Sequence, residues 1–246
     1  MKMSKNVKDY LNQIEKERMI RQQFFSNASH ELKTPITSIQ GYAELLESGM
    51  IQDESTKADF ASRIKKEAVR MTGLINDILM ISRLEAKEAE VTFSDVRVSV
   101  LLEEIIDSLK PQAAEAQVFV HVDCQPLMIH ANLQQMRELL TNLISNAIKY
   151  NRPGGQVWIN IRETDGQMVI RVKDNGVGIP SDSLDRIFER FYRVDKGRSR
   201  KQGGTGLGLS IVKHIVNFYH GTIHVSSEPD MGSEFTVFLP MFPEKG

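Results

Sequence analysis

The chain places a histidine beside a carboxylate near its start, a pairing that can make the imidazole a nucleophile. His30 and Glu31 lie in the middle of residues 25–35. Neutral imidazole is nucleophilic at pH 7 because its reference pKa is about 6.5, and Glu31 can hydrogen-bond the other ring nitrogen and accept its proton. Thr34 stands where a His-Glu-x-x-His zinc protease has its second histidine, which excludes that class. A histidine with a purely structural role is the alternative interpretation.

Asn142, Asn146 and Lys149 make a second pattern, at the end of a segment with helical periodicity. Spacings of four and three place them on one helix face. An amide oxygen is a neutral Mg²⁺ ligand that lets the metal keep waters and bind phosphate oxygens, and lysine adds a positive charge for phosphate. A polar helix face without a ligand is the common meaning of such a pattern, so the pattern needs support from elsewhere in the chain.

Two glycine-bearing segments supply that support. Asp174 lies at the end of an expected strand, and Gly176 and Gly178 after it let the backbone approach a flat ligand closely. The Asp174 carboxylate can accept a hydrogen bond from an exocyclic amine of such a ligand. A plain turn without a ligand is the alternative. Residues 204–208, Gly-Thr-Gly-Leu-Gly, open a helix whose free N-terminal amides can bind phosphate. Neither the Rossmann spacing nor a Walker lysine is present. Together with His30, these segments predict transfer of a phosphoryl group from a nucleotide.

Two long helices are expected to carry and position His30, over residues 5–48 and 55–86. Their apolar residues recur at spacings of three and four, as in coiled-coil seams. The stripe of the first helix includes Phe25, Ala28, Leu32 and Ile36. Pro35 is expected to bend that helix. A lone hairpin leaves much of its stripes exposed, so we expect two hairpins to pair as a four-helix bundle in a homodimer. Packing of the stripe on the rest of the same chain is the alternative.

From about residue 90, expected strands alternate with expected helices, which is typical of one sheet with helices on a face. The strands are predicted over residues 91–97, 118–122, 127–130, 156–163, 167–173, 222–227 and 233–239. The helices are predicted over residues 98–116, 132–150, 181–189 and 206–220. The expected fold class is therefore an all-α helical hairpin followed by an α+β sandwich.

The composition argues against several classes of protein. Lysine plus arginine (31) nearly balance aspartate plus glutamate (32), so no basic surface for nucleic acid is predicted. The single cysteine, Cys124, excludes an internal disulfide and is typical of a reducing, cytosolic setting. No apolar run reaches the roughly 18 residues of a membrane-spanning helix. No signal peptide opens the chain, and its abrupt polar start suggests a fragment of a longer protein.

The motifs resemble the sequence boxes of a known family. Residues 142–150, 174–178 and 204–208 resemble the N, G1 and G2 boxes of the GHKL ATPases, and residues 187–193 resemble the F box found only in their kinase branch. Residues 25–35 resemble the H box of the sensor histidine kinases of two-component systems. All five boxes are present, and the resemblance covers nearly the whole chain.

The resemblance implies transfer of the γ-phosphate of ATP to His30 and then to an aspartate of a response regulator, with Mg²⁺ held by Asn146. It implies that Asp174 takes the adenine amine and that Arg193 stabilises charge on the transferring phosphoryl group. It also implies that Thr34 positions a water for dephosphorylation of the regulator. The other nucleotide-binding residues it implies are Asn142, Lys149, Tyr150, Gly176, Gly178, Gly204, Thr205, Gly206, Leu207 and Gly208.

The resemblance also implies how the chain is organised. Residues 1–20 would be an N-terminal signalling helix, residues 21–88 a dimerisation and histidine phosphotransfer domain, and residues 89–246 a GHKL-type catalytic ATP-binding domain. Residues 195–206 would form a lid over ATP, anchored by the two phenylalanines of the F box. The expected partners are a second copy of the chain and a receiver domain, with no nucleic acid. The chain as given is expected in the cytoplasm. The full-length protein is expected in a bacterial cell membrane, through a sensor region not in this chain.

Two rival functions predict different sequence features from the kinase. A non-kinase ATP clamp of the gyrase or chaperone type predicts no H box and a lysine from elsewhere that reaches the γ-phosphate. A scaffold that binds nucleotide without catalysis predicts that catalytic residues are missing. The H and F boxes and the full set of catalytic residues favour the kinase.

Overall fold

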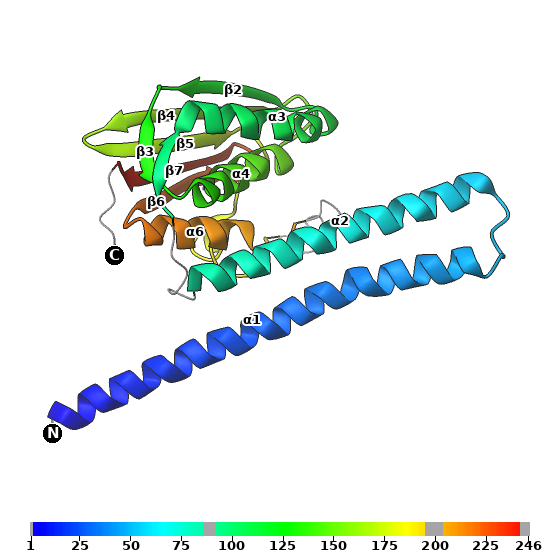
Figure 1. Cartoon of the computed structure of the whole chain (residues 1–246), viewed down its shortest axis with the longest axis horizontal. Helices are drawn as coiled ribbons and strands as arrows, with labels where there is room; N and C mark the ends of the chain where they lie inside the picture. Colours follow the sequence, from blue (N-terminus) through cyan, green and yellow to red (C-terminus); the bar gives the residue numbers. More distant parts are fainter. Residues whose placement is uncertain (1, 86–91, 195–203, 242–246) are drawn as a thin grey trace. The chain divides into compact units, whose positions relative to one another are not determined.

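The computed structural model of the protein describes residues 2–85, 92–194 and 204–241 (Figure 1). The chain divides into two compact units, residues 1–78 and residues 79–246. None of the described helices contains an apolar stretch long enough to cross a bilayer. The boundaries predicted at residues 20 and 88 stay predictions.

The first unit is the predicted helical hairpin, built from α1 (Lys2–Glu47) and most of α2 (Glu54–Glu85) (Figure 1). Asp53 begins α2 as its N-cap. The Thr56 hydroxyl and backbone N–H both donate to the Asp53 carboxylate, at 2.6 and 2.9 Å, and these bonds lower the pKa of Asp53 to about 2. The Tyr42 and Phe60 rings lie 5.1 Å apart across the hairpin, which fixes the antiparallel register of the two helices.

The apolar stripe of α1 differs from the predicted one at its start. Phe24 is buried, whereas Phe25, which the spacing placed in the stripe, is 60% exposed. Two adjacent aromatic residues cannot share one helix face, and Phe24 lies four residues before the buried Ala28. The helix continues through Pro35 to Glu47, although proline lacks the N–H that would bond the preceding turn. Further large apolar side chains of the hairpin are exposed, namely Ile36, Leu45, Val69 and Ile75.

The second unit is the predicted α+β fold, a mixed five-stranded sheet of order β2-β4-β5-β7-β6 with helices on one face (Figure 1). The strands are β2 (Phe119–Cys124), β4 (Gln156–Thr164), β5 (Gln167–Asp174), β6 (Thr222–Glu228) and β7 (Gly232–Pro240). The helices are α3 (Val98–Ala116), α4 (Leu133–Lys149) and α6 (Gly208–Phe218). β1 (Ser94–Arg97) and β3 (Met128–Ala131) form a separate two-stranded sheet. Among the strands that the structure describes, β2 and β4 pair in parallel and the other pairs are antiparallel.

Alternate residues of the central strands face the core. Ile159, Ile161 and Ile170 are fully buried under the helices, at 0–1% exposure. Tyr219, at the end of α6, locks the helices to each other: its hydroxyl donates to Gln135 at 2.7 Å and accepts the Asn132 N–H at 2.9 Å. These contacts hold α4 and α6 side by side, so that the end of α4 and the start of α6 stay in fixed positions.

The helix predicted over residues 181–189 is wrong. A single 3-10 turn, η1 (Ser181–Ser183), is followed by turns up to residue 191. Tertiary contacts decide this segment: the Tyr192 hydroxyl donates to Ser183 at 3.0 Å, Ile187 is buried, and Phe191 takes a left-handed φ of 63°. A regular helix could not make these contacts together.

Candidate functional site

His30 is exposed on α1, in the first unit, and the carboxylate next to it is held by the other helix of the hairpin. Glu31 Oε2 lies 3.6 Å from the Arg70 guanidinium of α2, and Glu67 lies 3.5 Å from the same side chain. The Thr34 hydroxyl donates to the His30 carbonyl oxygen at 3.3 Å. The hairpin therefore brings together His30, Glu31 and Thr34, as predicted, and adds Arg70, which the sequence did not single out.

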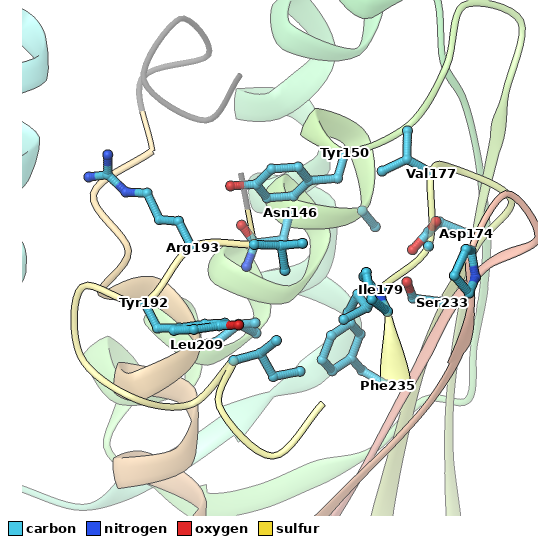
Figure 2. Close-up of a pocket in the computed structure, with 16 residues that line it drawn as sticks. Asn146, Tyr150, Asp174, Val177, Ile179, Tyr192, Arg193, Leu209, Ser233 and Phe235 are labelled. Carbon is cyan, nitrogen blue, oxygen red and sulfur yellow. The ribbon is translucent and has the colours of Figure 1, made fainter. Parts of the chain in front are cut away.

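A cavity of about 310 Å³ lies in the second unit (Figure 2). Its walls come from the end of α4, the loop after β5, residues 187–194, the start of α6 and the β6–β7 hairpin. The lining residues are Asn146, Ala147, Tyr150, Asp174, Val177, Gly178, Ile179, Pro180, Ile187, Tyr192, Arg193, Val194, Leu209, Pro229, Ser233 and Phe235. An apolar cavity with a few convergent polar groups is the usual form of a small-molecule site.

Asp174 sits at one end of the cavity, beside Ser233, whereas Arg193 lies at the other end (Figure 2). The Gly176 N–H donates to Asp174 Oδ1 at 2.8 Å. Burial disfavours the charged carboxylate and raises the pKa of Asp174 to about 6, while hydrogen bonds from the Gly176 and Ser233 backbones oppose the rise. A buried carboxyl with its remaining oxygen toward an apolar cavity is suited to accept a hydrogen bond from a flat ligand.

The glycine-rich segment after residue 203 packs on the F-box segment and on α4. The Phe191 N–H donates to the Gly206 carbonyl at 2.8 Å, and Gly206 has a left-handed φ of 75°. A methyl group on Gly208 would overlap Oδ1 of Asn142. Phe188 and Phe191 are not among the lining residues of the cavity, and the Lys213 ammonium lies 5.8 Å from the Phe188 ring. Most of the predicted lid, residues 195–203, lies outside the described residues.

The cavity includes five of the predicted nucleotide residues and not the others. Asn146, Tyr150, Asp174, Gly178 and Arg193 line it. The predicted residues that do not line it are Asn142, Lys149, Gly176, Gly204, Thr205, Gly206, Leu207 and Gly208. Lys149, Gly176 and Gly208 lie directly beside lining residues in the sequence, and the Lys149 ammonium lies 5.4 Å from the Tyr150 ring centre. Their ligand roles stay predictions.

Sequence reasoning missed several lining residues, among them Ile179, Leu209, Ser233 and Phe235. Ser233 and Phe235 are inward-facing positions of β7, and the alternation of a strand does not separate core positions from cavity positions. The signal that was available is polarity, because a serine at an inward position of a buried strand needs a partner. Ser233 finds one in Ser227, whose hydroxyl lies 2.9 Å away.

The side chains that line the cavity could hold a magnesium ion only together with the phosphate oxygens of a bound nucleotide. Among the described residues, no group of three or more histidine, cysteine, aspartate or glutamate side chains could hold a metal. Asn146 places an amide oxygen donor in the cavity wall. Mg²⁺ commonly takes one or two protein ligands and completes its shell with waters and substrate phosphates, so a single amide ligand is compatible with it.

The fold and the two sites are those of an ATPase-type nucleotide-binding domain joined to a helical hairpin that carries an exposed histidine. Residues 20–87 match the His Kinase A (phospho-acceptor) domain, and residues 131–243 match the histidine kinase-, DNA gyrase B-, and HSP90-like ATPase domain. The chain belongs to the two-component sensor histidine kinases.

Relatives and solved structures agree with that assignment. The chain is 38% identical over 230 residues to sensor protein kinase WalK of Staphylococcus saprophyticus, and 37% identical to that of Staphylococcus epidermidis. Each alignment covers 93% of this chain and 37% of the relative, so the chain spans little more than a third of these curated relatives. The structure resembles full-length ShkA at 28% identity and a TM-score of 0.66, covering 92% of this chain and 47% of ShkA. It also shares the fold of histidine kinase ThkA, at 22% identity, a TM-score of 0.71, and 95% and 67% coverage.

Proposed function

We propose that the chain is the kinase portion of a sensor protein, which transfers the γ-phosphoryl group of ATP to His30 and passes it to an aspartate of a response regulator. One observation carries the proposal: an exposed histidine with a positioned carboxylate occurs in the same chain as a cavity that presents a buried carboxyl to a flat ligand. Neither half alone would distinguish a kinase from an ATP clamp.

The chemistry at His30 follows from its neighbours. One imidazole nitrogen attacks the γ-phosphorus, the bond to the β,γ-bridging oxygen breaks, and ADP leaves with the electron pair. The ring then carries a positive charge, which it loses when Glu31 accepts the proton of the other nitrogen. The ion pair with Arg70, at 3.6 Å, keeps the Glu31 carboxylate at a fixed position between the two helices. Arg70 thereby acts through Glu31 rather than on the phosphoryl group.

In the cavity, Asp174 would accept the adenine amine and Tyr150 would line the nucleotide site, with Asn146 as the Mg²⁺ ligand. Mg²⁺ would supply neutralisation of phosphate charge in the bound nucleotide. Arg193 would stabilise charge on the transferring group, and Asn142, Lys149 and the glycine-rich segment would contact phosphates. ShkA, which this structure resembles, was crystallised in complex with AMPPNP, and that complex supports an adenine nucleotide as the ligand of this chain.

The proposed partners are a second copy of the chain and a receiver domain. Phe25 and Val69 leave 60% and 65% of their surfaces exposed on the hairpin, and such apolar surface favours pairing of two hairpins into a four-helix bundle. Histidine kinase ThkA, which shares the fold, has been crystallised with response regulator protein TrrA. We propose that Thr34 positions water for dephosphorylation of the regulator. The relatives' name, sensor protein kinase, supports a sensor region outside this chain. We propose that this region attaches the protein to a bacterial membrane.

Incubation of the full chain with γ-labelled ATP tests the proposal against its two rivals. A histidine kinase retains the label as a phosphoramidate that acid hydrolyses and alkali does not. An ATP clamp releases labelled phosphate without labelling the protein, and a scaffold leaves ATP intact. Label that survives acid would indicate a hydroxyl acceptor and contradict the proposal.

A further inference from the structure

Arg152 joins two loops that lie far apart in the sequence. Its Nη2 atom donates to the Gly176 carbonyl and to the Asp230 carbonyl, each at 2.7 Å. The first carbonyl belongs to the turn between Asp174 and Gly178, and the second to the loop that connects β6 to β7. One guanidinium nitrogen has two hydrogens, so a single atom satisfies both acceptors.

Both bridged loops form the wall at the Asp174 end of the cavity. Val177, next to Gly176, and Pro229, next to Asp230, are lining residues, and Figure 2 shows Val177 near Asp174. Arg152 itself is not a lining residue. Its side chain bonds the backbones of these loops, and Arg152 follows the end of α4 at Lys149 by three residues.

The bridge closes a ring of backbone hydrogen bonds. The Val177 N–H donates to the Tyr150 carbonyl at 3.0 Å, and the Asp230 N–H donates to the Val177 carbonyl at 2.9 Å. The Arg152 guanidinium donates to the Asp230 carbonyl, and Arg152 follows Tyr150 by two residues, so this bond connects the Asp230 loop back to the segment that contains Tyr150. Asp230 has a left-handed φ of 65°, a conformation that a non-glycine residue keeps only where its surroundings hold it. Removal of the guanidinium opens the ring at this point.

We propose that Arg152 is a positioning residue for nucleotide binding, which fixes the Gly176 and Asp230 loops around the base-binding end of the cavity without touching the nucleotide. The inference rests on the proposed function, because it takes the cavity as the ATP site. The Arg152 guanidinium also lies 3.7 Å from the Asp230 carboxylate, whose side chain is 90% exposed. This ion pair contributes little to holding the loop, because exposed ion pairs are weak. The two carbonyl bonds are the contacts that matter.

The obvious rival is that a cation so near the N box binds phosphate directly. The two roles predict different ligand dependence. Removal of a residue that binds phosphate directly lowers the affinity for ATP more than the affinity for ADP, and the contribution of such a residue falls with added salt. A positioning residue at the base end lowers the affinity for ATP and ADP by the same factor.

The test compares Arg152→Ala, Arg152→Lys and Asp230→Asn in the full chain, with Arg162→Ala as the matched control. Arg162 is an exposed arginine of the same unit, paired with Asp123 and outside the cavity. Calorimetric titration gives Kd for ATP and ADP, and autophosphorylation gives KM and the rate at saturating ATP. Melting temperature monitors folding.

We expect Arg152→Ala to raise Kd and KM about 10-fold for both nucleotides, which corresponds to about 1.4 kcal/mol, a typical cost of one lost hydrogen bond. The rate at saturating ATP should stay near that of the wild type. Arg152→Lys should recover part of the affinity, because an ammonium can still donate to a carbonyl. Asp230→Asn keeps the backbone carbonyl and tolerates the left-handed conformation, so it should bind like the wild type and like Arg162→Ala.

Several outcomes would overturn the inference. Wild-type affinity in Arg152→Ala, or a larger loss for ATP than for ADP, excludes the positioning role. So does a loss of the saturated rate with unchanged KM. A wild-type chain that binds neither nucleotide would overturn the proposed function together with this inference, whereas normal wild-type binding with an unaffected Arg152→Ala variant overturns this inference alone.

Discussion

Gly208, the first residue of α6, lies directly against the side chain of Asn142 on α4, and a methyl group on Gly208 would overlap Oδ1 of that asparagine. Asn142 cannot turn away freely, because its Nδ2 donates to the Glu138 carbonyl at 2.9 Å. We expect Gly208→Ala to lower the melting temperature, since overpacking a fixed contact costs about 1–3 kcal/mol. Thermal unfolding followed by circular dichroism measures the effect.

The control for this contact is the double variant Gly208→Ala with Asn142→Ala. Removal of the asparagine side chain makes room for the new methyl group, so the pair should melt at a higher temperature than the sum of the single effects predicts. Additive losses would show that the overlap is relieved by movement elsewhere. ATP binding should fall in all three variants, because both residues belong to the predicted phosphate-binding region.

Asp174 should make the stability of the ATP-binding unit depend on pH. Burial raises its pKa from 3.8 to about 6, so the folded state favours the protonated form. That favourable contribution is fully present below pH ~4 and is lost as pH rises through about 6. Asp174→Asn removes the ionisable group but keeps an oxygen that can accept the Gly176 N–H. We therefore expect this variant, without nucleotide, to exceed the wild type in stability at pH 8 by on the order of 1–2 kcal/mol, after allowance for solvent screening, and to match it below pH ~4.

The same substitution should harm recognition of the base. Asparagine has a single acceptor oxygen, and if the Gly176 N–H holds that oxygen, the NH2 group faces the adenine amine, and two donors cannot bond each other. Preference for ATP over GTP should fall by about 1–3 kcal/mol. Urea unfolding followed through Trp158, the single tryptophan, and titration with both nucleotides give the two readouts. An equal stability difference at both pH values would mean that ionisation of Asp174 is not its cause.

The features that could be predicted from the sequence depend on local patterns, whereas the features that could not depend on contacts between distant parts of the chain. Helix α3 (Val98–Ala116) was predicted to the residue, and the ends of β4 and β5 to within one residue, because local periodicity and the turn at Asp165–Gly166 determine them. The turns after η1 depend on contacts such as the bond from Tyr192 to Ser183, which no local pattern carries. The choice of Phe24 over Phe25 follows the spacing of four residues to Ala28, which the prediction did not use. The candidate site divides in the same way. Motif residues such as Asp174 and Asn146 could be named in advance, whereas Ser233, Arg70 and Arg152 became visible only through their partners in space.

The pair of Glu31 and Arg70 should matter for the chemical step alone. Glu31→Gln keeps the size of the side chain but cannot take a proton, and we expect autophosphorylation to slow by about 10²–10⁴-fold with ATP affinity unchanged. Arg70→Gln should slow it by a smaller factor, because Arg70 acts by holding Glu31. The double variant should be no slower than Glu31→Gln. If the two losses multiply instead, Arg70 has a role independent of Glu31.

Thr34 should separate kinase from phosphatase activity. Its hydroxyl donates to the His30 carbonyl at 3.3 Å, a long bond within the helix whose loss costs little stability. Attack on ATP needs His30 and Glu31 but not this hydroxyl, whereas water attack on the aspartyl-phosphate of a regulator needs an oriented water. Thr34→Ala should keep most autophosphorylation and slow dephosphorylation of the regulator. Kinase rate, phosphatase rate and melting temperature are measured on one preparation; equal loss of both activities with lower melting would mean that Thr34 is structural.

The central claim is that His30 receives the phosphoryl group of ATP bound in the cavity of the second unit. Labelling with γ-labelled ATP, compared between the wild type and His30→Gln at matched concentration, tests it most directly, with nucleotide affinity measured on both. We expect acid-labile, alkali-stable label on the wild type, none on His30→Gln, and the same ATP affinity for both. Label of the same chemistry persisting on His30→Gln would contradict it.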